Sequence, residues 1–137
     1  MNRRTLAARC GLALLSLLAT PWAAAQDYPS RPLRIVVPWP AGGLVDLAAR
    51  TLAQRLQAAL GQPVVVDNRV GAGGNIGADL VAKAPPDGHT LVFTSSALTI
   101  STAMRARMPF DALKDLEPLA AVARAPSVLV VHPTSGV

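Results

Sequence analysis

Three strand-like runs separated by helical patterns constrain the fold of this chain more than any other feature. The runs cover residues 33–37, 64–66 and 91–94, and they are rich in valine, isoleucine and leucine. A long stretch with helical spacing of its apolar residues lies between the first two runs. Strands that alternate with helices are typical of a parallel sheet covered on both faces. We therefore predict an α/β fold with a parallel sheet.

The helical patterns also predict which side chains face the sheet. A helix is predicted over 44–60, because Gly61 can cap its C-terminus and Pro63 prevents its continuation. Its predicted inner stripe recurs every four residues at Leu44, Ala48, Leu52, Leu56 and Leu60, and it is widened by Val45, Ala49, Ala53 and Ala59. A second helix is predicted over 76–84, with an inner face of Ile76, Leu80 and Val81. A third is predicted at about 98–107, and further strands at 119–122 and 128–131.

Residues 1–25 have the three parts of a secretory signal peptide. Arginines come first, an apolar stretch follows, and a run of small residues at 23–25 precedes the predicted cleavage site before Gln26. The apolar stretch is shorter than the roughly 20 residues that span a membrane. We therefore expect a periplasmic protein exported by a cleavable signal, through either the general or the twin-arginine route. The mature α/β lobe is predicted over 26–127, and a crossing strand or hinge over 128–137.

The charge and cysteine content narrow the function classes. Three of the 13 Lys and Arg residues lie in the predicted signal, which leaves ten basic against eight acidic residues and a net charge of +2. That balance, with no basic cluster, gives no indication of nucleic-acid binding. Cys10 is the only cysteine and lies within the signal, so the mature chain has no cysteine for a disulfide or a metal site.

Small residues follow each of the three strand-like runs. Because the carboxyl ends of parallel strands meet at one edge of a sheet, the loops at 40–43, 71–75 and 94–96 are expected to lie together. Each loop precedes a predicted helix, whose free N–H groups and dipole favour anions. The glycines could also serve only as tight turns. The candidate ligand-binding residues are Trp39, Ala41, Gly42, Gly43, Asp46, Gly73, Gly74, Asn75, Ser95 and Ser96.

Some of these residues admit two roles. Asp46, in the first turn of the long helix, could cap that helix or accept a hydrogen bond from a ligand. Trp39 could flank a pocket or simply pack. His89 and His132 are expected to be surface histidines, and no nucleophile, base or carboxylate pair has catalytic spacing.

One rival interpretation remains open at the glycine loop. Gly71, Gly73 and Gly77 form G-x-G-x-x-x-G, one residue longer than the dinucleotide-binding pattern. An exported enzyme or a nucleotide-binding domain is therefore the alternative. Export argues against a soluble nicotinamide cofactor, and we expect no cofactor and no enzymatic activity.

Four ordered motifs resemble a known family, the Bug-type periplasmic receptors of tripartite tricarboxylate transporters. They occupy residues 28–46, 61–77, 84–91 and 109–118, and include PWPAGG followed by Asp46, and GAGGNIG. The resemblance implies an α/β lobe of a two-lobed Venus flytrap, similar to type II periplasmic binding proteins. Family chains are much longer, so we expect an incomplete first lobe without the second.

The resemblance also implies a function. Members of the family capture a small carboxylate, such as a di- or tricarboxylate, an aromatic acid or an acidic amino acid, and deliver it to a membrane permease. A second alternative is a signalling role, in which the liganded receptor docks a sensor protein. By resemblance, Gly42 and Gly43 would offer N–H groups to the ligand carboxylate, with Asp46 nearby. The residues at 73–75 and the serines at 95–96 would line the cleft wall. The sequence leaves the identity of the acid open.

Overall fold

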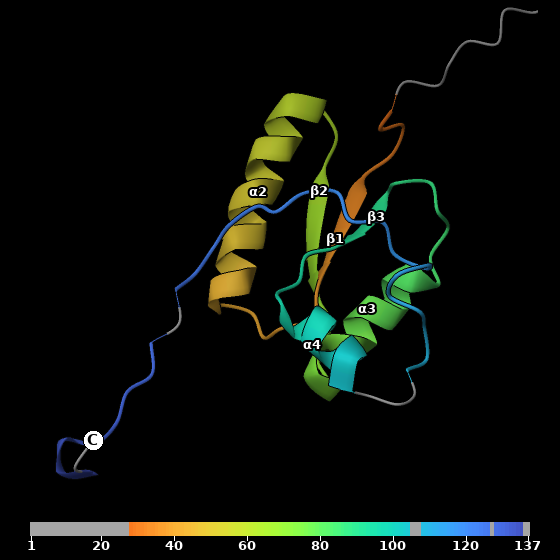
Figure 1. Cartoon of the computed structure of the whole chain (residues 1–137). Helices are drawn as coiled ribbons and strands as arrows, with labels where there is room; N and C mark the ends of the chain where they lie inside the picture. Colours follow the sequence, from red (N-terminus) through yellow and green to blue (C-terminus); the bar gives the residue numbers. More distant parts are fainter. Residues whose placement is uncertain (1–27, 105–107, 127, 136–137) are drawn as a thin grey trace, which may run out of the picture.

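The structure is a computed structural model that describes residues 28–104, 108–126 and 128–135 (Figure 1). The predicted signal peptide and its cleavage site lie outside the described residues, so export stays a prediction. In the part that is described, no helix has both the length and the apolar character needed to cross a membrane.

Three parallel strands form the sheet, in the spatial order β2-β1-β3. They are β1 (Leu33–Val37), β2 (Val64–Asn68) and β3 (Thr90–Val92). On the central strand, Ile35 lies opposite Val66 on one side and Leu91 on the other. The parallel sheet predicted from the strand–helix alternation is confirmed, although β3 ends two residues earlier than expected.

The helices cover the sheet from two sides. Helix α2 (Leu44–Leu60) contacts β1 and β2, and α3 (Asn75–Ala82) contacts β1 and β3. Crossovers between parallel strands are nearly always right-handed, and with this strand order that rule places α2 and α3 on opposite faces of the sheet. Figure 1 shows α2 and α3 on either side of the strands. Helix α4 (Ala97–Met104) contacts α3 and the short 3-10 helix η1 (Ala72–Gly74).

The main core lies between β1 and α2. Ile35 and Val37 are buried there against Ala49 and Ala53, and larger side chains from β2, β3 and α2, with Trp39 and Phe93, pack around them. The alanines let the helix backbone approach the sheet closely. On the other face, Val36 of β1 and Ala78 of α3 are completely buried.

The two predicted helix faces were right only in part. In α2, Ala49 and Ala53 are buried as predicted, together with Asp46, whereas Leu44 of the predicted stripe is 70% exposed. In α3 the buried residues include Gly77 and Ala78, whereas Ile76 is 53% exposed. In both helices small residues make the closest approach to the sheet. The largest apolar side chains therefore do not mark the centre of the buried helix face.

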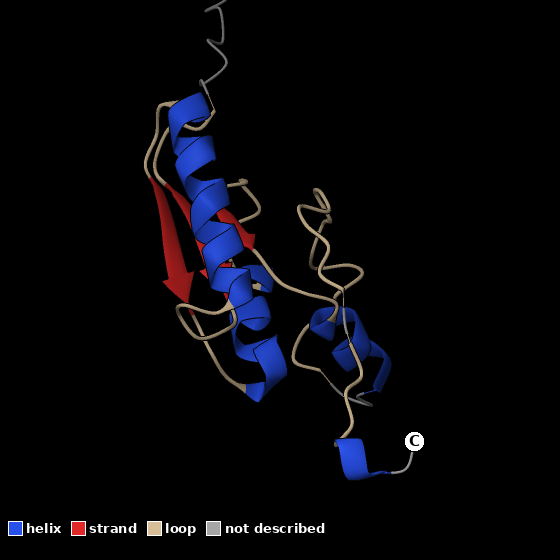
Figure 2. Cartoon of the chain, turned by 90° about the vertical axis from the view of Figure 1, so that its left-hand side faces the viewer, coloured by secondary structure: helices blue, strands red, loops and turns tan. Residues whose placement is uncertain are grey.

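The strands predicted at 119–122 and 128–131 are absent. The structure has irregular backbone there, and Leu119 is 74% exposed and Leu129 94% exposed. Figure 2 shows this C-terminal part leading away from the sheet to the short helix η2 (Pro133–Ser135). A β-branched run forms a strand only when a neighbouring strand pairs with it, and the described residues supply none here. The assignment of 128–137 as a hinge stays a prediction.

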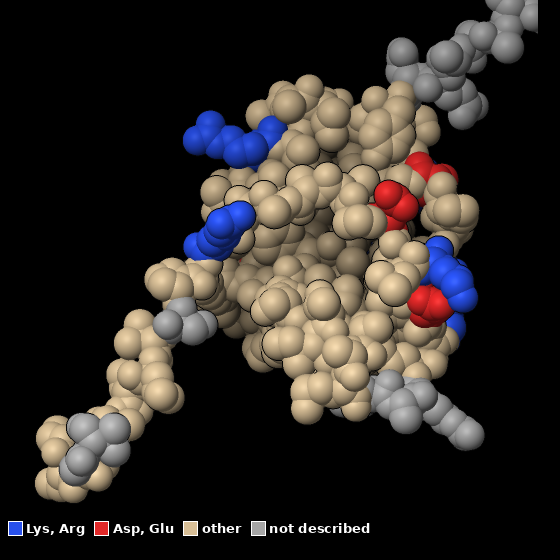
Figure 3. All heavy atoms as spheres, viewed as in Figure 1, with Lys and Arg blue, Asp and Glu red and all other residues tan. Residues whose placement is uncertain are grey.

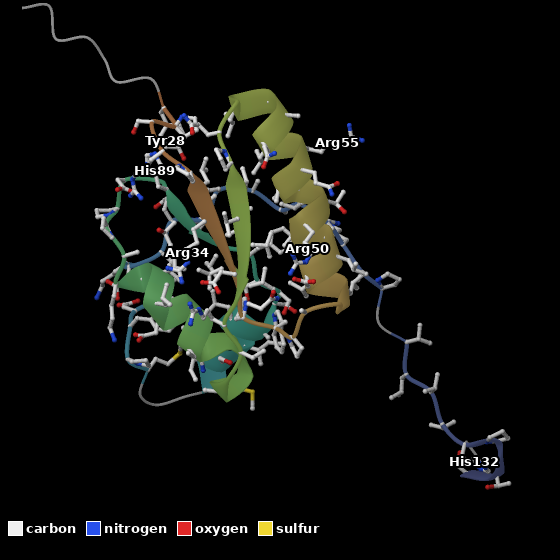
Figure 4. All side chains as sticks on the ribbon, turned by 180° about the vertical axis from the view of Figure 1, so that it is seen from behind. Tyr28, Arg34, Arg50, Arg55, His89 and His132 are labelled. Atoms are coloured by element: carbon white, nitrogen blue, oxygen red, sulfur yellow. The ribbon has the colours of Figure 1, made fainter. Side chains whose placement is uncertain are left out.

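His89 is not the surface residue that we expected, since only 6% of it is exposed. Its Nδ1 lies 3.0 Å from the Asp87 carbonyl oxygen, and its ring meets that of Tyr28 edge to face at 5.0 Å. Figure 4 shows Tyr28 and His89 together at one end of the sheet, near the start of β1. His132, in contrast, is exposed and pairs with Thr134.

Candidate functional site

The loops that leave the three strands come together at the carboxyl edge of the sheet, as predicted. Figure 1 shows the starts of α2 and α3 at this edge, together with α4. The first two loops touch, because a methyl group placed on Gly74 would lie 3.7 Å from Cζ2 of Trp39. The third loop joins them through α4, which contacts η1. This edge therefore carries the candidate site.

Asp46 is the most buried polar side chain at this edge, with 1% of it exposed. Its Oδ2 accepts hydrogen bonds from the Gly42 N–H at 2.8 Å and from Arg50 Nε at 2.9 Å. Its Oδ1 accepts a third from Asn68 Nδ2 at 2.9 Å. The Arg50 hydrogen bond, followed by those of Gly42 and Asn68, holds the pKa of the Asp46 carboxyl well below its usual range. Asp46 is therefore an ionised carboxylate within a network of internal donors.

Asn68 completes this network, and our sequence analysis did not select it. Its Nδ2 also donates to the Trp39 carbonyl at 3.0 Å, and its Oδ1 accepts from Arg50 Nη2 at 3.1 Å. Figure 4 shows Arg50 where α2 faces β2. Asn68 thus ties the end of β2 to the first loop and to α2. A polar residue at the end of a β-branched run was the signal that could have identified it.

The network affects which peptide N–H groups a ligand can use. The Gly42 N–H already donates to Asp46, and the Gly43 N–H donates to the Pro40 carbonyl at 3.4 Å. The first hydrogen bond of α2 runs from the Leu47 N–H to the Gly43 carbonyl at 2.9 Å. The N–H groups of Leu44 and Val45 precede that bond, at the positive end of the helix dipole. A bound anion would meet these two donors without competing with Asp46.

The glycine loop turns sharply before α3. Gly73 and Gly74 have φ angles of +67° and +96°, in the left-handed region that favours glycine. Gly77 serves packing instead, because a Cβ there would lie 2.9 Å from Cβ of Pro38 and 3.1 Å from the Arg69 carbonyl oxygen. The close approach of α3 to the first loop therefore accounts for the third glycine of the G-x-G-x-x-x-G pattern.

Asn75 is the first residue of α3, and 5% of it is exposed. Both its Nδ2 and its Oδ1 are buried without a hydrogen-bond partner, and so is Nε1 of Trp39. Buried polar groups in proteins are nearly always paired. These unpaired atoms come from two of the three loops that meet at the site.

The remaining predicted residues lie on the surface of the same edge. Ala41 is exposed in the first loop, and both serines are exposed in the third. The hydroxyl oxygen of Ser95 accepts a hydrogen bond from the Ala97 N–H at 3.3 Å, at the start of α4. Among the residues that the structure describes, no group of three or more His, Cys, Asp or Glu side chains could hold a metal ion.

Comparison with known proteins identifies the family. Residues 48–137 match the family model described as the tripartite tricarboxylate transporter family receptor, TctC. The protein BugT of Bordetella pertussis (strain Tohama I) is 43% identical over 135 residues, which cover 97% of this chain and 41% of BugT. The chain spans about two-fifths of the length of the curated relatives it matches.

Solved structures agree with this assignment. MatC (Rpa3494) from Rhodopseudomonas palustris, solved with bound malate, aligns with a TM-score of 0.61 and 34% identity, over 69% of this chain and 33% of MatC. The R. palustris protein Rpa4515, solved with adipate, aligns with a TM-score of 0.58 and 40% identity, over 62% of this chain and 29% of that one. The predicted fold class, an α/β lobe of the periplasmic-binding-protein type, is confirmed. The chain belongs to the TctC family of tripartite tricarboxylate transporter receptors, which includes the Bug proteins.

Proposed function

We propose that this chain forms the first carboxylate-binding lobe of a periplasmic solute receptor for a tripartite tricarboxylate-type transporter. The observation that carries the proposal is the meeting of the α2 and α3 N-termini at the carboxyl edge of the sheet. Membership of the family supports a receptor rather than an enzyme. Relatives solved with malate and with adipate support a small carboxylate as the ligand.

In the proposed mechanism, the ligand carboxylate docks on the N–H groups at the start of α2. Asp46 holds the first loop in position through the Gly42 N–H and Asn68, so the donors are arranged before the ligand arrives. A second lobe, such as the longer relatives have room for, would close over the ligand and exclude water. Closure is driven only by the ligand's higher affinity for the closed state. The liganded receptor would then engage the membrane permease, and a sensor protein is a further possible partner.

A substitution at Gly43 tests the proposal. Its φ is −76°, and a Cβ there would lie 3.4 Å from the Pro40 carbonyl oxygen, so the fold accommodates a side chain. In Gly43→Val, the valine methyl groups would stand over the N-terminus of α2 and block a ligand. We expect the affinity for the best carboxylate to fall more than tenfold, while the unfolding free energy changes by less than about 1 kcal/mol.

The measurement is isothermal titration calorimetry on the protein expressed from its complete coding sequence. The ligand is chosen beforehand by a thermal-shift screen of carboxylates, since a ligand that binds only the folded form raises the melting temperature. Ala58→Val is the matched control, because Ala58 is exposed near the far end of the same helix. Equal affinities in Gly43→Val and Ala58→Val would contradict the proposal.

A further inference from the structure

The unpaired amide atoms of Asn75 distinguish this residue from Asp46 and Asn68 at the same site. The side-chain oxygen and nitrogen atoms of Asp46 and Asn68 are hydrogen-bonded to each other, to Arg50 and to the first loop. Asn75 is more than nine-tenths buried, and neither its donor nor its acceptor has a partner. A buried amide in this state destabilises the folded protein unless another molecule pairs with it.

The chemistry of these unpaired atoms limits what can pair with them. Nδ2 of Asn75 and Nε1 of Trp39 are donors, and a carboxylate can accept hydrogen bonds from both. Oδ1 of Asn75 is an acceptor only, and an ionised carboxylate has no proton to offer it. A ligand that satisfies the whole amide must therefore carry a donor, such as a hydroxyl or an ammonium group, close to its carboxylate.

We propose that Asn75 makes the site selective for carboxylates that carry a hydroxyl or ammonium group beside the carboxylate. This inference rests on the proposed function and specifies its ligand class. Oδ1 of Asn75 accepts a hydrogen bond from the ligand's hydroxyl or ammonium, while the Asn75 amide N–H and the α2 N-terminus donate to the carboxylate. Trp39 Nε1 provides a further donor from the first loop.

The ligand reaches Asn75 after a small local movement. Both amide atoms are covered by neighbouring protein atoms, and the terminal torsion of an asparagine turns over a broad range at low cost. The preceding turn consists of Gly71, Ala72, Gly73 and Gly74, all at positive φ, and carries a single Cβ. Few side chains of this turn therefore have to move when the amide rotates toward the ligand.

The test uses pairs of acids that differ by one hydroxyl: malate and succinate, citrate and tricarballylate, mandelate and phenylacetate. Binding constants are measured by calorimetry on the protein expressed from its complete coding sequence. In any pair of which at least one acid binds, we expect the hydroxy acid to bind at least tenfold more tightly than the plain acid, which lacks the hydroxyl. The reason is that the plain acid leaves Oδ1 of Asn75 unpaired.

The Asn75→Leu variant isolates the contribution of the amide. Leucine has a similar size and no polar atoms, so the variant should fold with unchanged or higher stability. We expect it to bind the hydroxy acid and the plain acid within about threefold of each other, chiefly through loss of affinity for the hydroxy acid. Gln54→Leu, at an exposed position of α2, is the control and should keep the wild-type preference.

Two results would overturn the inference while leaving the proposed function intact. One is a wild-type protein that binds both acids of each pair equally. The other is an Asn75→Leu variant that weakens both acids by the same factor, which would make Asn75 a general donor. If no carboxylate binds to a folded wild-type protein, the proposed function itself fails, and the inference fails with it.

Discussion

Replacing Gly77 with alanine would test how the two glycine-rich loops are held together. Gly77 lies in the first half of α3 and packs against Pro38, the residue that follows β1. An added Cβ would lie 2.9 Å from Cβ of Pro38, 3.1 Å from the Arg69 carbonyl oxygen and 3.2 Å from Cα of Pro38. None of these atoms belongs to a flexible side chain, so the backbone itself must move.

The expected effect is the difference between two opposing contributions. Overpacking of a tight contact costs about 1–3 kcal/mol, and contacts with a proline ring and a backbone carbonyl favour the upper half of that range. Alanine in place of glycine inside a helix returns about 1 kcal/mol. We therefore expect Gly77→Ala to lower the free energy of unfolding by about 1–2 kcal/mol. The displaced first loop should also weaken binding of any carboxylate.

The assay is urea denaturation with a matched set of variants at Gly61. Gly61 ends α2 at φ +67°, and a Cβ there would meet no atom within 4 Å. Gly61→Ala should be destabilising because of its backbone angle alone, by about 1 kcal/mol. Asparagine tolerates this angle, so Gly61→Asn should recover part of the loss, whereas Gly77→Asn should be worse than Gly77→Ala. A Gly77→Ala protein as stable as wild type would refute the packing argument.

Three further outcomes follow from the geometry. Ile35→Ala should lower the unfolding free energy by about 2–5 kcal/mol in urea denaturation, because Ile35 is 1% exposed in the main core. Ser95→Ala should cost up to about 1 kcal/mol, measured in the same way, because the Ala97 N–H loses its acceptor. Asp46→Asn should reduce the loss of stability on acidification. The pKa of Asp46 is lower in the folded than in the unfolded protein. Its contribution to stability is therefore complete above the unfolded pKa of about 3.9 and is lost progressively as the pH falls from there toward the folded pKa. Urea midpoints of both proteins between pH 5 and pH 2 would check this, and parallel curves would contradict it.

The sequence was sufficient to predict the three strands of the sheet, the ends of α2 and the edge where the loops meet. Each of these depends on local signals: β-branched runs, the spacing of apolar residues, and Gly61 followed by Pro63. Gly61 does end α2 in the left-handed conformation, with its N–H bonded to the Gln57 carbonyl. In the sheet and in α2 these local signals agree with the tertiary packing, because each strand has a paired neighbour and α2 packs against the sheet.

The errors came from features that depend on distant partners. The β-branched run at 128–131 has strand propensity, but no described strand pairs with it. His89 is buried because Tyr28, 61 positions earlier, packs across its ring, and their separation in sequence gives no sign of the contact. The hydrogen bond between Asp46 and Asn68 of β2 could not be predicted either, because the two residues are 22 positions apart in the sequence.

The geometry of Asp46 separates the two roles that its position in the sequence allowed. A carboxylate that already accepts from Gly42, Arg50 and Asn68, and is 1% exposed, has almost no capacity left for a ligand. If Asp46 only positions the first loop, Asp46→Asn should weaken hydroxy acids and plain acids by the same factor in calorimetry, because the α2 donors are misplaced for both. If Asp46 instead accepts a hydrogen bond from the ligand, the loss should fall on the hydroxy acids alone. We expect the first pattern, with selectivity carried by Asn75.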